Sequence, residues 1–229
     1  MTIFDLDHVG IAVRDLDAAA AAYRRLGFTL TQKSEHMTAG PDGTLVPAGT
    51  GNRCFMLGRG YVELIAVTRP EYRGRLLNDL AHHEGLHLVS VGAPSARQAE
   101  EVFARTTGRS VAARRVKRPF RESGRDFTAE FAIVDLPDGA VSGLHLFAIE
   151  HLTRDAIWQP QLLNHPNGAT ALVSVTVAAD ERFAAHVAHL LDAPSRGGRI
   201  SLAQGAIEIA TPAVIAHRFP GAAQPAPPA

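Results

Sequence analysis

The chain has 229 residues, of which 46% are hydrophobic and 20% charged, as in an ordinary soluble globular protein. Its 23 lysines and arginines balance its 23 aspartates and glutamates, so no basic excess predicts binding to nucleic acid. No apolar run approaches the roughly 20 residues that span a bilayer, and the N-terminus lacks the features of a signal peptide. Cys54 is the single cysteine, which excludes an intrachain disulfide, so we expect a cytoplasmic protein.

Residues 1–70 have the pattern of a β-α-β-β-β module. Residues 7–13 alternate between two kinds of side chain, which is typical of a strand with two different faces. Asp15 or Asp17 then caps a helix that runs to Leu26, and Gly27 ends it. Three further short strands are predicted at residues 29–33, 53–57 and 61–67.

A second module of the same order is predicted over residues 71–160. It begins with a strand at residues 86–91, and a capping box of Ser95 and Gln98 opens a helix that Gly108 ends. Strands follow near residues 111–117, 126–134 and 144–150.

A third, shorter βαββ-like module is predicted over residues 161–220. It has a strand at residues 172–178, a helix capped by Asp180 and a hairpin over residues 199–210. Its first strand contains no histidine, so we expect no metal half-site there. Residues 221–229 contain only Ala, Pro, Gly and Gln, the composition of a disordered tail.

The first two modules each carry a histidine in the first strand and a glutamate in the last. His8 is followed by Glu63, and His87 by Glu150. The first and last strands of such a module can lie close together, so the four side chains could converge on one divalent metal between the modules. A glutamate inside the run Tyr-Val-Glu-Leu-Ile is costly to bury unless it is paired or coordinated, so Glu63 is the more diagnostic residue. The competing interpretation is a set of hydrogen-bonded core residues.

The choice of Glu150 depends on which face of its strand enters the cleft. His145 lies an odd number of positions away and faces the opposite side. We expect Glu150 to face the cleft, with Phe147 and Ile149 packed under the helix. His151 replaces Glu150 if a bulge shifts the register.

Three residues are candidates for substrate binding. Arg118 belongs to a basic run that is typical of a solvated hairpin edge, but an arginine from it that reached the cleft would clamp a carboxylate or phosphate. Asn52, beside glycines, is either a polar contact to substrate or a turn residue. Trp158, in the linker before the third module, either covers the pocket or packs on the core.

The segments that contain these residues resemble the vicinal oxygen chelate superfamily, specifically its glyoxalase-like domain proteins. The resemblance rests on residues 7–13 through 26–28, on residues 49–53 and 60–64, and on Glu150-His151 with Trp158 and residues 165–169. It implies an α+β fold in which tandem modules form a cup-shaped mixed sheet around a metal. His8, Glu63, His87 and Glu150 would then be the ligands of Zn, Ni, Mn or Fe. One of the two glutamates would detach and return a proton. Similar domains do not always keep a histidine at the position of His87, so a three-ligand or metal-free version stays open.

The resulting hypothesis is a metal-dependent enzyme, of isomerase/lyase or dioxygenase type, that chelates a small oxygen-rich molecule. The alternative is a non-enzymatic protein of the same fold that sequesters an antibiotic or another small molecule, as bleomycin resistance proteins do. A third interpretation is a structural module with a degenerate cleft. The third module is free to form a homodimer.

Overall fold

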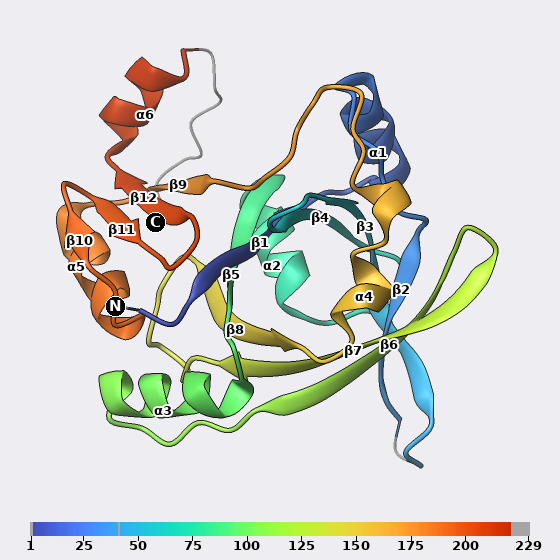
Figure 1. Ribbon diagram of the computed structural model, residues 1–229, viewed down its shortest axis with the longest axis horizontal. Coiled ribbons are helices and arrows are strands. Elements are labelled where there is room, and N and C mark those ends of the chain that lie inside the picture. Colours follow the sequence, from blue (N-terminus) through green and yellow to red (C-terminus); the bar gives the residue numbers. More distant parts are fainter. Residues whose placement is uncertain (1, 41, 221–229) are drawn as a thin grey trace.

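Two sheets, of eight and four strands, organise the chain in the computed structural model, which describes residues 2–40 and 42–220 (Figure 1). The tail predicted at residues 221–229 lies outside this part. The first unit consists of β1 (Asp5–Ala12), α1 (Leu16–Arg25), β2 (Ser34–Ala39), β3 (Leu45–Met56) and β4 (Tyr61–Val67).

The second unit repeats this order after an intervening helix, α2 (Arg75–His82), which the sequence did not predict. It consists of β5 (Gly85–Gly92), α3 (Ala96–Thr107), β6 (Arg114–Glu122), β7 (Arg125–Asp135) and β8 (His145–His151). A linker with α4 (Arg154–Ile157) and the short 3₁₀ helix η1 (Pro160–Leu162) leads to the third unit.

The third unit contains one strand more than expected. Its elements are β9 (Ser174–Ala178), α5 (Glu181–Leu190), β10 (Ser195–Arg196), β11 (Arg199–Ser201) and β12 (Ala206–Ala210), followed by α6 (Pro212–Arg218). The extra strand, β10, is only two residues long, which is too short to leave an alternating pattern in the sequence. The unit is therefore a small but complete β-α-β-β-β unit.

The first two units form one curved sheet with the strand order β2-β3-β4-β1-β5-β8-β7-β6. In each unit the first strand pairs parallel with the last, and β1 pairs antiparallel with β5 at the centre. The edge strands β2 and β6 approach one another, so the sheet forms a nearly closed cup (Figure 1). The predicted fold class is confirmed.

Local signals explain where the elements begin and end. The Asp15 side chain accepts hydrogen bonds from the backbone of Asp17 and Ala18 at the start of α1. Gly108 ends α3 with a φ of 67°, a backbone conformation that favours glycine. The strand predicted at residues 29–33 is absent, and β2 begins at Ser34 instead. In the predicted segment Thr31 donates its N–H to the Cys54 backbone oxygen, and its hydroxyl accepts from the Cys54 N–H. These two bonds are a local contact and do not extend into a ladder.

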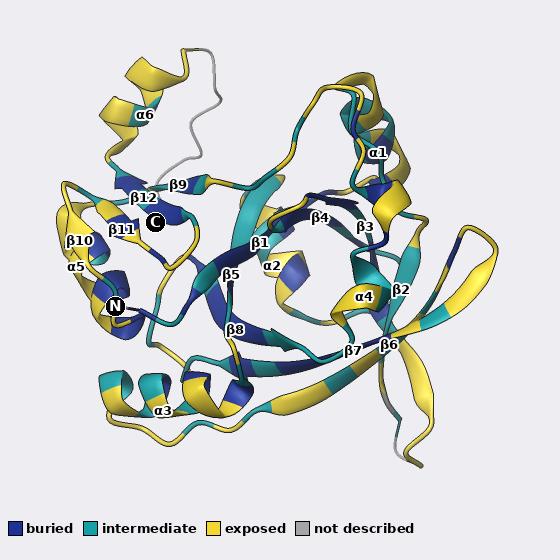
Figure 2. Cartoon of the chain, viewed as in Figure 1, coloured by how far each residue is buried: buried dark blue, intermediate teal, exposed yellow. Residues whose placement is uncertain are grey.

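A single large hydrophobic cluster joins the third unit to the cup. It contains Phe4 from the segment before β1, Phe103 from α3, Val187 from α5 and Ile207 from β12, all fully buried (Figure 2). The third unit is thus packed on the outside of the cup through α3 and α5. Among the helices of the described residues, none has the length and apolarity that crossing a bilayer requires.

Candidate functional site

The concave face of the eight-stranded sheet encloses a cavity of about 260 Å³. Six of its lining residues have a charged or imidazole side chain: His8, His36, Glu63, Arg114, Arg118 and His145. Most of the others are apolar, among them Leu88, Val116, Phe131, Phe147 and Ile149. A small molecule in this cavity would meet a polar region of mixed charge inside an otherwise apolar wall.

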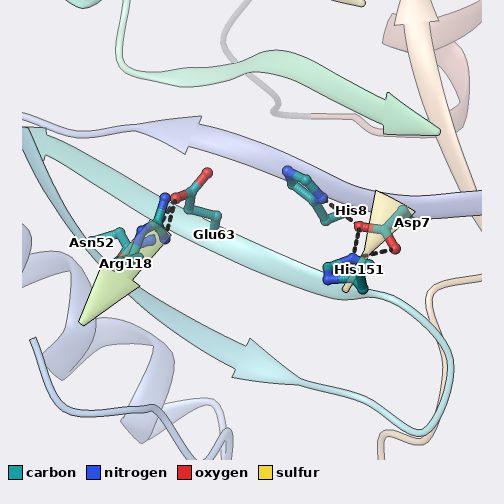
Figure 3. Close-up of polar contacts among 6 residues, drawn as sticks. All are labelled: Asp7, His8, Asn52, Glu63, Arg118 and His151. Carbon is teal, nitrogen blue, oxygen red and sulfur yellow. Dashed lines mark hydrogen bonds and ion pairs between the residues drawn. The ribbon is translucent and has the colours of Figure 1, made fainter. Parts of the chain in front are cut away.

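A buried carboxylate connects two imidazoles at the end of this cavity. Asp7 Oδ1 lies 2.6 Å from Nδ1 of His8, and the two Asp7 oxygens lie 3.1 and 3.0 Å from Nε2 of His151 (Figure 3). Consecutive residues of a regular strand point to opposite faces, but the register of β1 against β5 shifts between Leu6 and His8. This bulge lets Asp7 reach the side chain of its own neighbour.

The charge state of Asp7 fixes the role of His8. Burial alone would raise the pKa of Asp7, but the hydrogen bonds from His151 and His8 outweigh it and hold the pKa well below its ordinary value. Because the carboxylate can only accept, Nδ1 of His8 carries the hydrogen that it donates to Asp7. Nε2 of His8 has no hydrogen-bond partner among the described residues and presents its lone pair to the cavity. The His8 ring is also held by stacking on Tyr61, with ring centroids 4.3 Å apart.

Glu63 is a second buried carboxylate, on β4 beside His8. Its Oε1 accepts a hydrogen bond of 2.5 Å from the Asn52 amide, and lies 3.4 Å from His36 Nε2 and 4.0 Å from Arg118 Nη1. Burial opposes ionisation, but His36 and Arg118 more than offset it, so the pKa of Glu63 is far below its usual range. The carboxylate lies between Arg118 and Asn52 on one side and His8 on the other (Figure 3).

The registers of the two units show why the expected four-ligand site does not form. His8 pairs with Tyr61 and Leu88 pairs with His145, and each is seven residues before its helix cap, Asp15 or Ser95. Leu88 therefore occupies the position of His8. By the same register Phe147 occupies the position of Glu63. The predicted His–Glu half-site of the second unit is therefore out of register, by one residue at His87 and by three at Glu150.

His87 and Glu150 consequently lie outside the cavity. His87 Nε2 donates to the backbone oxygen of His83 at 2.9 Å, beside α2. Glu150 Oε2 accepts from the backbone N–H of Ala96 at 2.7 Å, at the start of α3. Phe147 and Ile149, which were expected under the helix, line the cavity instead. The alternation along β8 was predicted correctly, but its two faces were exchanged.

Of the three residues predicted to bind substrate, only Arg118 lines the cavity. Its role in binding stays a prediction. Asn52 donates a hydrogen bond to Glu63 and does not line the cavity. Trp158 donates through Nε1 to the Leu57 backbone oxygen and packs edge-on against His151, so it belongs to the packed linker.

Asp7 and His151 also border a second, larger pocket, which we call the outer pocket. It has a volume of about 880 Å³ and lies between the cup and the third unit. Its other charged residues are Asp5, Arg59, Glu150, Arg154 and Arg199. His151 Nδ1 is buried without a hydrogen-bond partner in the described part of the chain.

The comparisons with known proteins agree with this architecture. The family model described as "Glyoxalase-like domain" matches residues 6–193. The chain belongs to the glyoxalase-like domain family. Its fold is that of the vicinal oxygen chelate superfamily, as the sequence resemblance implied.

Solved structures share the fold of this glyoxalase-like protein at low sequence identity. A hypothetical protein from Staphylococcus aureus is 12% identical with a TM-score of 0.60, over 91% of this chain and 87% of that one. A mutant of 4-hydroxymandelate synthase from Streptomyces coelicolor is 15% identical with a TM-score of 0.51, over 91% of this chain and 62% of that one. No curated protein sequence matches significantly. At these identities the likeness concerns the fold alone.

The donor set of this glyoxalase-like protein does not fit a resident divalent metal. Catalytic metal sites generally use three protein ligands, and the described residues contain no group of three or more His, Cys, Asp or Glu close enough to bind one ion. His8 and Glu63 face the cavity, but the equivalent positions of the second unit are Leu88 and Phe147. Arg118 already places a positive charge near Glu63.

Sequence reasoning missed two polar residues of the site. Asp7 stands beside His8 in the sequence, but an ideal strand would direct the two side chains apart, and only the bulge joins them. His36 lies on β2, in a segment without a recognisable alternating pattern. The adjacent pair Asp7-His8 was the available signal.

Proposed function

We propose that this glyoxalase-like protein is an enzyme that moves a proton on a small anionic carbonyl compound, without a resident metal. The observation that carries the proposal is the Asp7–His8 pair, whose free imidazole nitrogen faces a cavity that also contains Arg118. Relative to the sequence hypothesis, the small oxygen-rich substrate is kept and the metal is not.

His8 is the general base of this proposal. With Nδ1 donating to Asp7, Nε2 accepts a proton from a carbon next to the substrate carbonyl. The Asp7 carboxylate then stabilises the imidazolium that forms, and it keeps the ring in one tautomer. His8 returns the proton to the same carbon or to a neighbouring one, which makes the reaction an isomerisation.

Arg118 supplies the positive charge that the reaction needs. Removing a proton next to a carbonyl places negative charge on oxygen, and a guanidinium in a buried cavity stabilises such charge strongly. Glu63, ionised and fixed by Asn52, accepts a hydrogen bond from a substrate hydroxyl and orients it.

The test is exchange of carbon-bound protons in D₂O, followed by proton NMR over a panel of small 2-oxo and 2-hydroxy carboxylates. Wild type should exchange the proton next to the carbonyl of at least one compound, and the rate should persist after dialysis against EDTA. His8→Gln and Asp7→Asn should each lower the rate by about 10²-fold or more, because both remove the oriented base.

Arg118 has a matched control on the same strand. Arg115 is exposed and points away from the cavity, so Arg115→Met should leave exchange unchanged, whereas Arg118→Met should raise KM. Exchange that stops with EDTA and returns with a divalent metal contradicts the metal-free proposal. Tight binding of a compound with no exchange in any member of the panel favours a sequestering protein instead.

A further inference from the structure

The three units of the chain contain the same strands and helix in the same order, but they differ in what covers the outer edge of the first strand. In each unit the parallel first and last strands contain a buried apolar pair in the common core: Val9 with Val62, Val89 with Leu146, and Val175 with Ile207. Val175 of β9 is thus the counterpart of Val9 in β1 and of Val89 in β5.

The outer edge of that first strand is covered in two of the units. β1 and β5 pair antiparallel, with Val9 opposite Val89, His8 opposite Ser90 and Gly10 opposite Leu88. Because Val9 and Val89 are equivalent, this pairing has a local two-fold axis between them. The cup exists because each unit covers the open edge of the other.

The same edge of β9 is open in the described part of the chain. β9 ends the order β10-β11-β12-β9, and among the described residues it pairs with β12 alone. The Val173 oxygen and the Ala179 N–H both bond to β12, so the alternation of the backbone directs the N–H and C=O groups of Ser174, Thr176 and Ala178 outward. Open edges of this kind are templates for pairing with another chain.

The third unit exposes three large apolar side chains. Val173, directly before β9, is 63% exposed, and Val214 and Phe219 at α6 are 53% and 46% exposed. No residue of α6 is buried, and the helix stands away from the rest of the structure (Figure 2). Glu208, the acid on the neighbouring strand β12, is already paired with Arg199 and Arg218, so its charge does not oppose pairing at this edge.

We propose that two copies of this chain pair through β9, antiparallel and about a two-fold axis at Val175, in the way that β1 pairs with β5. Ser174 of one copy then lies opposite Thr176 of the other, and the two third units form a second, smaller cup. The arrangement is isologous, because the same strand serves both copies, and it uses the outward backbone groups of Ser174 and Thr176.

The experiment measures mass and cross-linking of the full chain. Wild type should have twice the monomer mass of 24.4 kDa in multi-angle light scattering. Thr176→Pro removes an outward N–H without touching the ladder to β12, so it should give the monomer mass. The matched control Thr176→Val keeps the N–H and should stay dimeric.

A second variant tests which residues of the two β9 strands face each other, and its expected result is a gain of a covalent bond. Residues facing each other as a hydrogen-bonded pair have Cα atoms about 5.5 Å apart, within the range of a disulfide. The double variant Ser174→Cys/Thr176→Cys should therefore form a covalent dimer on oxidation, while each single variant and wild type should not. A wild type that is monomeric, or a dimer that forms no such disulfide and survives Thr176→Pro, overturns the proposal.

Discussion

His145 is a cavity residue whose protonation is set by its surroundings. Burial, and then the nearby Arg75, lower its pKa to about 4, so the imidazole is neutral at neutral pH. It stands on β8 at the position that Tyr61 has on β4. A neutral, partly buried imidazole at this position adds no further positive charge to a cavity that Arg114 and Arg118 already line.

This shift predicts a stability change with pH. An unfolded histidine takes up a proton near pH 6.5, whereas folded His145 does so only near pH 4. Between these values the unfolded state binds more protons, so the free energy of unfolding should fall as the pH is lowered from about 6.5 to 4. Urea titrations across this window should show a steeper loss for wild type than for His145→Gln. Equal slopes for the two proteins would mean that His145 titrates normally.

At the scale of one residue, the sequence located parts of the site and missed the contacts that define it. Glu63 was recognised because a carboxylate in an apolar run needs a partner, and the structure supplies Asn52, His36 and Arg118. The identity of those partners depended on strands that are distant in sequence. Asp7 was out of reach for another reason, since its contact with His8 requires an irregular strand.

Strands β5 and β8 show how a shift by an odd number of residues, one at His87 and three at Glu150, changes a functional prediction. The alternating patterns of both strands were visible in the sequence, and β8 was predicted within one residue of its bounds. Alternation does not say which face turns inward, since both faces of these strands contain apolar residues. Only the pairing registers assign Leu88 and Phe147 to the cavity and Glu150 to α3.

The new position of Glu150 predicts a structural effect without a functional one. Glu150→Ala removes the acceptor for the Ala96 N–H at the start of α3, which should cost about 1 kcal/mol of unfolding free energy, the usual effect of losing a helix cap. Carbon-proton exchange at 25 °C should equal that of wild type. Measured together, a lower urea midpoint with unchanged exchange separates a capping residue from a catalytic one. A large loss of exchange with unchanged stability would restore Glu150 to the active site.

At the scale of the whole molecule, the third unit is part of the hydrophobic core. Phe4 and Phe103 belong to the first two units, yet they share one cluster with Val187, Ile200 and Ile207 of the third. The repeated order of elements in the sequence indicated three modules. It did not indicate how the modules pack, because an apolar side chain gives the same sequence pattern whichever unit buries it.

Removing the third unit should therefore destabilise the cup. A chain that ends at residue 170 would expose the apolar surface around Phe4 and Phe103, and we expect it to aggregate and to bind a hydrophobic dye such as ANS. A chain that ends at residue 220 keeps every described core residue and should match the full chain in both measurements. A shortened chain that stays soluble, with wild-type exchange, would show that the cup folds by itself.

The bulge in β1 has a consequence for the two hollows of the molecule. Asp7 holds His8, which opens to the cup, and His151, which opens to the outer pocket, on one shared carboxylate. Removing this one carboxylate would release both rings, so the walls of the two hollows depend on a single side chain.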